Sequence, residues 1–308
     1  MKNRAAFLGL LVVLIGIASS VVFKAFASPI NLKSLVMNLS TEAIVAIGMM
    51  ILLVSGCFDL SVGSIFGLAG AIAARFMYYN HYAVWISVFI SFLVCLSIGA
   101  FNGVLIAKVG VNPLIVTLAT MGLVRGFVRI IAGTGIIGFP AAFTGIASTT
   151  FFGLRLPIWY MVGLTALFSF LVSKTVFFRR FYYIGSNEKA AMLSGMNIAK
   201  MRIVSFVIMA GLAAFSGITF SARIETSLST LGNGMELRAI TACVLGGASI
   251  AGGKGSVLGA VLGTLFVAVI NNLMIIGKVN TYWQQVVIGT ILLTAVTLDA
   301  VLHIKQSE

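Results

Sequence analysis

Charged and hydrogen-bonding side chains are scarce in this sequence, so those that interrupt its long apolar stretches are the first candidates for chemistry. Of the 308 residues, 60% are hydrophobic and only 9% are charged. A charge at the centre of a membrane helix costs about 2.5–3.5 kcal/mol or more, so polar groups at that depth usually serve a function. Such groups suit recognition of a solute in transit. The candidates are Asp59, Ser61, Asn102, Asn112, Thr117, Thr120, Arg125 and Asn271.

Asp59 follows the second apolar stretch, within Gly56-Cys57-Phe58-Asp59-Leu60-Ser61. If a helix begins just after it, the carboxylate can accept hydrogen bonds from the free N–H groups there, with Ser61 and Ser64 close by. Direct contact with a substrate is the alternative. Capping is the favoured interpretation.

A second polar group lies around the fifth apolar stretch. Asn112 precedes Pro113, which is tolerated in the first turn of a helix. Thr117 and Thr120 are three residues apart and share a helix face, and Arg125 lies further along. With Asn102 and Asn271, these residues could hold a neutral polyhydroxylated ligand, or they could form hydrogen bonds between helices. Both interpretations stay open at this point.

No pattern of a catalytic or metal site is present. Cys57, Cys95 and Cys243 lie singly in apolar stretches, and His81 and His303 stand alone. The sequence shows no Ser/His/Asp set and no pair of carboxylates that would indicate an enzyme. It also lacks the G-x-x-x-x-G-K-[ST] motif of ATP-binding P-loop proteins. We therefore predict no catalytic residue, no metal and no cofactor in this chain.

The elements that position these residues must be membrane helices. Soluble domains carry about 25% charged residues, and a bilayer core of about 30 Å needs about 20 apolar residues per helix. We predict one all-α membrane domain over residues 1–308. The ten predicted spans are 6–27, 35–55, 61–78, 84–107, 112–132, 158–178, 203–222, 237–251, 256–276 and 283–302. The eighth is short and rich in glycine, which also fits a broken or re-entrant helix.

The basic residues predict the orientation. The chain has 20 basic and 7 acidic residues. In a membrane protein this excess sets orientation and meets anionic lipid head groups, and it does not indicate nucleic acid. Six basic residues lie in or just before the segment 179–202: Lys174, Arg179, Arg180, Lys189, Lys200 and Arg202. This segment is therefore predicted to be cytoplasmic. Counting the spans in both directions makes both termini cytoplasmic.

A short internal similarity accompanies two of the breaks between spans. Gly-Ser-Ile-Phe-Gly at 63–67 and Gly-Ser-Val-Leu-Gly at 255–259 each begin an apolar helix rich in small residues. Transporters built from duplicated halves show such pairs of interrupted segments. Chance similarity in a glycine-rich sequence is the alternative.

The polar stretch 185–199 predicts a short helix. Asn187 can cap its start and Gly195 can end it, with Ala190, Ala191 and Met192 as a small apolar face between them. Such a helix can sit in the groove of a partner protein. It can equally be a loop associated with lipid head groups, and the residues alone do not decide.

Four stretches together resemble a known family. Residues 55–63 are similar to its S-G-G-I-D-L-S-V-G motif, and residues 112–120 with Arg125-Gly126 are similar to N-P-F-I-x-T-L-G-T and R-G. Residues 185–195 match G-x-N-x-x-A-A-x-x-S-G, and residues 236–256 fit E-L-x-A-I and L-G-G-x-S-x-x-G-G-x-G-S. The chain thus resembles bacterial ABC-transporter permeases of the ribose/galactose type, whose superfamily also holds branched-chain amino-acid permeases. Cys57, Ala119 and Arg238 depart from these motifs, which bears on the substrate more than on the family.

The resemblance implies an importer in the bacterial inner membrane that carries a monosaccharide or a related solute. It implies two permease subunits, of the same or different chains, a cytoplasmic ATPase that uses the ATP, and an extracytoplasmic solute-binding protein. The residues that it places against the ATPase are Gly185, Asn187, Glu188, Ala190, Ala191, Ser194 and Gly195. A permease for branched-chain amino acids is the main alternative. An ion-coupled transporter is disfavoured because no acid occurs between Asp59 and Glu188.

Overall fold

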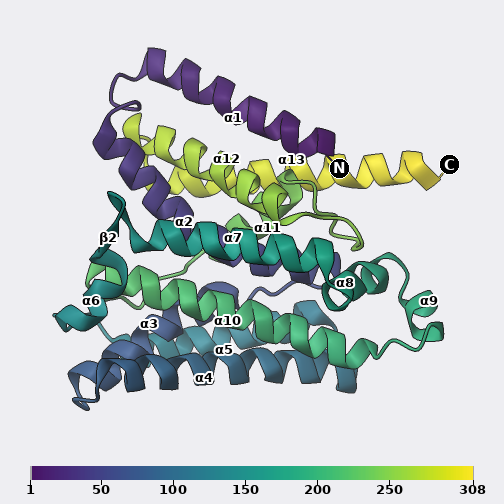
Figure 1. Cartoon of the computed structure of the whole chain (residues 1–308), viewed down its shortest axis with the longest axis horizontal. Coiled ribbons are helices and arrows are strands. Elements are labelled where there is room, and N and C mark those ends of the chain that lie inside the picture. The colour runs from purple at the N-terminus through teal and green to yellow at the C-terminus, as the bar shows by residue number, and fades with distance from the viewer. Residues whose placement is uncertain (1, 308) are drawn as a thin grey trace.

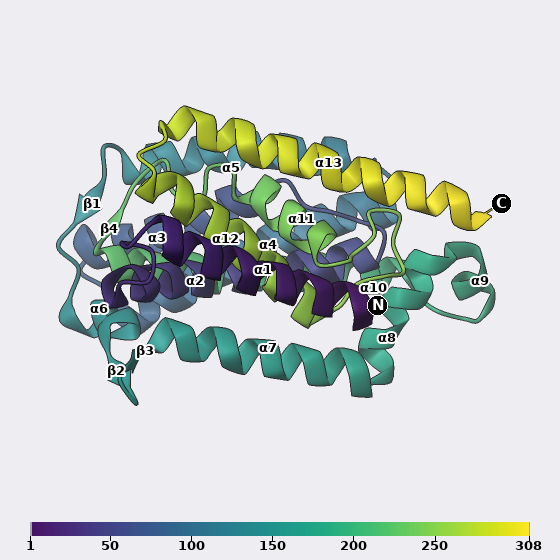
Figure 2. The ribbon, with the colours of Figure 1, turned by 90° about the horizontal axis from the view of Figure 1, so that it is seen from above.

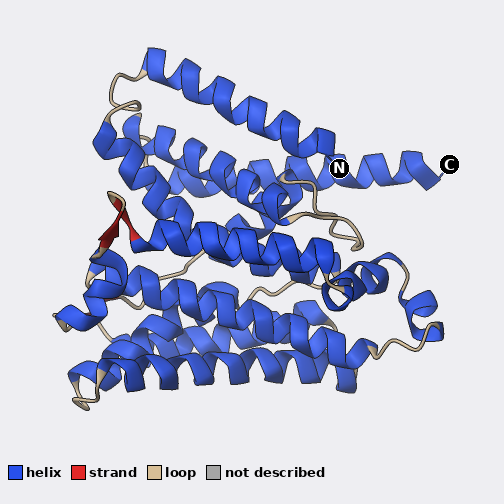
Figure 3. Ribbon diagram, viewed as in Figure 1, coloured by secondary structure: helices blue, strands red, loops and turns tan. Residues whose placement is uncertain are grey.

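The computed structural model describes residues 2–307, which fold almost entirely into helices packed side by side (Figures 1 and 3). The longer helices are α1 Lys2–Val22, α2 Pro29–Val54, α3 Val62–Tyr78, α4 Val84–Val104, α5 Pro113–Ala132, α7 Leu156–Lys174, α10 Ile198–Ile224, α12 Val257–Ile276 and α13 Thr281–Ser307. The shorter ones are the π-helical turn η1 Leu105–Val109, α6 Ala141–Ser148, α8 Val176–Ser186, α9 Glu188–Leu193 and α11 Met235–Leu245.

Six helical segments within the described residues are long and apolar enough to cross a membrane: α2, α4 with η1, α5, α7, α10 and α12. Shorter apolar stretches occupy much of α1, α3 and α13. This confirms the predicted all-α, multi-pass membrane fold. The number of ten spans stays a prediction.

Helix α2 forms the centre of the molecule. Its residues from Ala43 to Val54 are all buried, because the helix is apolar around its whole circumference. Helices α7, α10, α11 and α12 pack around it, and α3, α4 and α5 form a further group that contacts α10 mainly through α3 and α4. Small residues allow the close approach of α10 to α3, since a Cβ on Gly217 would overlap the carbonyl oxygen of Phe66.

The two ends of the helix bundle differ. At one end lie two short antiparallel pairs, β1 Ile136–Ile137 with β4 Thr226–Ser227, and β2 Thr150–Phe151 with β3 Leu154–Arg155 (Figure 2). We call this the strand end. Helices α8 and α9 lie at the opposite end, here called the α9 end, together with both ends of the described chain (Figures 1 and 2). The termini and the segment 179–202 therefore share one end of the molecule, as the predicted topology requires.

The eighth predicted span, 237–251, is wrong as a continuous crossing. Helix α11 covers only the 11 residues Met235–Leu245, which is about 16 Å of helix and too short for a bilayer core. Glycine-rich turns follow from 246 to 255, with positive φ at Gly247, Gly252 and Gly253. The broken-helix alternative is the one that the structure shows.

Other boundaries differ by a few residues because capping side chains fix them. Helix α2 begins at Pro29 and not near 35, since the Ser28 hydroxyl accepts a hydrogen bond from the Asn31 N–H. The sixth span ends at Lys174 and not at 178, because Thr175 caps the separate helix α8. Asn197 caps α10 at Ile198, before the predicted start at 203.

Candidate functional site

Asp59 lies in the break between α2 and α3, where its side chain is completely buried. One carboxylate oxygen, Oδ1, accepts hydrogen bonds from the Ser61 backbone N–H at 2.7 Å and from the Ser61 hydroxyl at 2.6 Å. Since α3 begins at Val62, the carboxylate fixes the backbone that leads into the helix. Asp59 thus bonds the N-cap residue Ser61, whereas the first N–H groups of α3 receive no side-chain cap. The predicted capping of the helix by Asp59 is not confirmed.

The hydrogen bonds continue from Ser61 into α4 and α5. The Asn102 amide nitrogen donates to the Ser61 hydroxyl at 3.1 Å, and the Thr120 hydroxyl donates to the Asn102 amide oxygen at 2.7 Å. Asp59, Ser61 and Asn102 are 0% exposed and Thr120 is 5% exposed. We call these four residues the break network. They connect the α2–α3 break to α4 and α5. Hydrogen bonding between packed helices therefore explains why most of these polar groups are buried.

One atom of the break network stands apart. The second carboxylate oxygen of Asp59, Oδ2, is buried and has no hydrogen-bond partner within the described residues. An unpaired buried acceptor is costly, and an ordered water is one way to satisfy it.

The other candidates in or beside α5 make separate contacts. Asn112 is exposed and caps α5 by accepting the Leu114 N–H at 2.8 Å. Thr117 is buried and donates to the carbonyl of Pro113 in its own helix. Arg125 reaches the loop after β4, where its guanidinium donates to the carbonyl of Leu231 at 2.6 Å. These three side chains do not join the break network.

The loop that Arg125 holds, residues 228–234, packs closely on the start of α3. A Cβ on Gly63 would overlap the carbonyl of Gly232, and a Cβ on Gly232 would overlap that of Gly63. Gly232 also has φ +77°, which favours glycine. This loop leads into α11 and helps to enclose a polar cavity.

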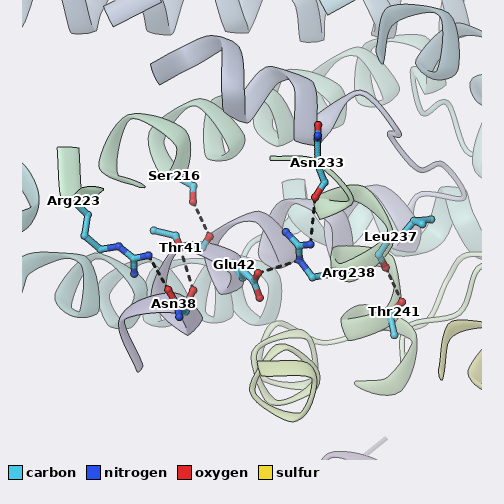
Figure 4. Close-up of polar contacts among 9 residues, drawn as sticks. All are labelled: Asn38, Thr41, Glu42, Ser216, Arg223, Asn233, Leu237, Arg238 and Thr241. Carbon is cyan, nitrogen blue, oxygen red and sulfur yellow. Dashed lines mark hydrogen bonds and ion pairs between the residues drawn. The ribbon is translucent and has the colours of Figure 1, made fainter. Parts of the chain in front are cut away.

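That cavity has a volume of about 320 Å³ and lies between α2, α11, α12 and the loop 228–234. Asn271, the candidate on α12, lines it. Two other residues, Asn38 and Glu42, come from the middle of α2. Glu42 Oε1 accepts from Arg238 Nε of α11 at 3.1 Å, and the amide oxygen of Asn38 accepts from Arg223 of α10 at 2.7 Å (Figure 4).

Glu42 and Asn38 are not among the eight predicted residues. The signal for Glu42 is that it is the one acidic residue in the predicted span 35–55, and a charge at membrane depth needs a partner. That partner, Arg238, is noted in the sequence only because it departs from the family motif around residues 236–240. The eight predicted residues therefore divide into the break network, three residues in or beside α5 with separate contacts, and Asn271 in a separate cavity.

The segment between α8 and α10 forms the predicted short helix. The Asn187 side chain accepts the Ala190 N–H at 3.0 Å, and Gly195 ends the turn with φ +77°. Glu188 and Arg202 form an ion pair at 2.6 Å that connects α9 to α10. The predicted helix, its cap and its end are confirmed.

The outward face of α9 differs from the prediction. Ala191 is only 3% exposed and packs into the main apolar core, so it is wrong to expect it to face a partner. Met192 and Leu193 are 59% and 90% exposed, and Ala190 and Ser194 are exposed as well. The α8–α10 packing, which no local pattern encodes, decides which side of α9 is free.

Gly185 lies at the end of α8 and not on α9. A Cβ there would overlap the carbonyl of Val54 and lie 2.7 Å from the backbone nitrogen of Gly253. The Gly253 N–H donates to that same carbonyl at 2.9 Å. Tyr182, one turn earlier, donates to the carbonyl of Gly255 at 3.0 Å, and burial raises the pKa of its phenol to about 12, so it stays a neutral donor. The α9 region is thus anchored to the end of α2 and to the turn before α12.

Comparison with protein families gives the class of the molecule. Residues 31–296 match the model of the family described as branched-chain amino acid transport system / permease component. The chain belongs to this permease family. It is therefore a multi-pass membrane permease component, and the expected membership is confirmed.

The similar curated proteins include three with different solutes in their names. The chain is 38% identical to the L-arabinose transport system permease protein AraH of Escherichia coli K12, over 94% of this chain and 89% of the relative. It is 33% identical to the ribose import permease protein RbsC of Haemophilus influenzae, over 96% of this chain and 93% of that relative. It is 32% identical to the autoinducer 2 import system permease protein LsrC of Salmonella paratyphi B, over 88% of this chain and 79% of that relative. No solved structure matches the chain.

Proposed function

We propose that this chain is the transmembrane permease subunit of an ATP-driven importer for a monosaccharide or a related polyhydroxylated solute. The observation that carries the proposal is the similarity, over nearly the whole chain, to permeases named for L-arabinose and ribose. The cavity beside α2 supports it, because amide, carboxylate and guanidinium groups line it together with aromatic rings.

The proposed complex contains a second permease subunit, a cytoplasmic ATPase and an extracytoplasmic solute-binding protein. The ATPase hydrolyses the ATP, so this chain needs no cofactor of its own. The α9 end faces the cytoplasm in this proposal. Six basic residues between 174 and 202 support that orientation through the positive-inside rule. Both termini then lie on the cytoplasmic side, and the surrounding lipid contacts the apolar helices.

Helix α9 is the proposed docking element for the ATPase. Its exposed Met192 and Leu193 offer apolar anchors for a groove in the partner. The Glu188–Arg202 ion pair connects α9 to α10. The preceding helix, α8, packs closely against the end of α2 and the turn before α12, because Gly185 has no side chain. A movement of the ATPase would thereby be transmitted through α8 to the breaks after α2 and before α12. This movement shifts the permease between its outward-open and inward-open states only if the contacts differ in the two states.

A second candidate function is import of a branched-chain amino acid. The description of the family model favours it. The two candidates predict different effects of a loaded binding protein on ATP hydrolysis.

The test uses the permease together with the ATPase and the solute-binding protein of the proposed importer. The complex is purified by a tag on this chain, and ATP hydrolysis is measured with the binding protein loaded with D-ribose, L-arabinose, D-galactose or L-leucine. Stimulation by one of the sugar-loaded forms supports the proposal. Stimulation by the leucine-loaded form alone would instead support import of a branched-chain amino acid. If no ATPase copurifies with the permease, both candidate functions are wrong.

A further inference from the structure

The cavity beside α2 contains an ion pair with unused hydrogen-bonding capacity. Glu42 Oε1 is bonded to Arg238 Nε at 3.1 Å. Glu42 Oε2 and Arg238 Nη2 have no hydrogen-bond partner within the described residues, while Arg238 Nη1 donates to the Asn233 carbonyl at 3.3 Å. The two side chains are 21% and 24% exposed, and both line the cavity. The pair is thus neutral overall but still offers an acceptor and a donor to a solute.

Amide groups offer further donors and acceptors in the same cavity. The carboxamide oxygen of Asn271 is buried and has no partner in the part of the chain that the structure describes. Asn38 uses its oxygen for Arg223, which leaves its N–H₂ donors available. Gln284 of α13 also lines the cavity. Buried polar groups are nearly always satisfied, so an unpaired amide oxygen beside a cavity indicates a bound polar molecule or water.

The cavity also has an aromatic side. Phe66 of α3 and Phe220 of α10 line it, with ring centroids 5.5 Å apart and planes tilted by 56°. Its volume of about 320 Å³ lies at the lower end of the range for small-molecule sites. A site of this size, with polar groups on several sides and aromatic carbon on another, suits a small ring that carries hydroxyl groups.

We propose that this cavity binds one neutral monosaccharide within the permease. The sugar hydroxyls would bond to the free atoms of Glu42, Arg238 and Asn271, and the C–H face of the ring would lie toward Phe66 and Phe220. This inference rests on the proposed function and assigns a site to it. The break network is not part of the site, because its residues do not line this cavity.

The ion pair favours a neutral solute over an amino acid. A zwitterionic amino acid needs a cationic partner for its carboxylate and an anionic partner for its ammonium group. In this cavity Glu42 and Arg238 already neutralise each other, so neither offers an uncompensated charge to the ammonium or the carboxylate of an amino acid. Both charged groups would lose their hydration for partners that are already paired, whereas a sugar has no charge to desolvate. Binding at an intermediate site must also be weak enough to allow release.

The test measures Tm of the purified full-length permease in lipid nanodiscs. The added solutes are L-arabinose, D-ribose, D-galactose and L-leucine, with sucrose at the same concentration to correct for general osmolyte stabilisation. At about ten times Kd, binding should raise Tm by about 3 °C. Each protein is compared with its own sample without solute, so a change in intrinsic stability does not affect the result.

Three variants remove cavity groups: Glu42→Gln, Asn271→Leu and Gln284→Leu. The matched controls are Gln285→Leu and Glu225→Gln, because both residues are exposed and neither lines the cavity. We expect at least one of the three monosaccharides to raise Tm in the wild type and in both controls, and the rise to fall to less than a third of that value in the cavity variants. No rise in the wild type, an equal rise in the cavity variants, or a larger rise with L-leucine overturns the assignment.

This experiment is independent of the test of the proposed function. If sugar-loaded binding protein stimulates ATP hydrolysis but no monosaccharide raises Tm, the importer stands and the cavity assignment is wrong. If a monosaccharide raises Tm through the cavity residues but sugar-loaded binding protein gives no stimulation, the site stands and the importer is wrong.

Discussion

Leu193→Glu tests whether α9 docks the ATPase without disturbing the permease itself. Leu193 is 90% exposed, so the substitution changes few contacts in the isolated chain. In a docked complex it would remove a buried leucine, worth about 1.5–3 kcal/mol, and bury a carboxylate without a partner, which costs several more. A combined loss of about 4 kcal/mol weakens binding roughly 1,000-fold. The permease should keep its Tm and lose its ATPase.

The assay pairs the Tm of the purified permease with the Kd for the ATPase. Ala191→Glu is the contrasting variant, since Ala191 is 3% exposed and a carboxylate there disturbs the packing of α9. It should lower Tm as well as binding. Leu193→Met keeps an apolar side chain and should bind normally. An ATPase affinity of Leu193→Glu within threefold of the wild type would refute the docking role of α9.

The other predictions concern the connections of α9, the break network and topology. Gly185→Ala pushes a Cβ into the carbonyl of Val54; this overpacking should lower stability by about 1–3 kcal/mol, and an unchanged Tm with normal sugar uptake would contradict the close contact. Asn102→Leu leaves the buried Thr120 hydroxyl without its acceptor, and Thr120→Val leaves the buried Asn102 amide oxygen without its donor, so each should cost about 1–3 kcal/mol; negligible changes in denaturation midpoint for both would show that the network carries little stability. Reporter fusions at the C-terminus and near Lys189 should give cytoplasmic signals, and a periplasmic signal at either position would overturn the orientation.

The fold and the local caps could be predicted because short-range patterns determine them. Apolar runs of membrane length give α2, α5, α7, α10 and α12. Asn112 and Asn187 each cap a helix through an N–H two or three residues away, and Asp59 bonds the N–H of Ser61 just before α3. These contacts are short-range, so they follow from the neighbouring sequence.

The contacts between distant segments could not be predicted in the same way. Glu42 and Arg238 are 196 positions apart, and only the packing of α11 on α2 brings them together. The burial of Ala191 similarly depends on how α8 and α10 enclose α9. The eighth span was too long because its hydropathy continues through turns that positive-φ glycines create after Leu245.

Uptake by the reconstituted complex tests the central claim most directly. The permease, its ATPase and its solute-binding protein are placed in proteoliposomes, and entry of radiolabelled L-arabinose, D-ribose, D-galactose and L-leucine is measured with and without ATP on the ATPase side. We predict accumulation of a monosaccharide that needs both ATP and the binding protein. Accumulation of L-leucine alone, or sugar uptake driven by an ion gradient without ATP, would contradict it.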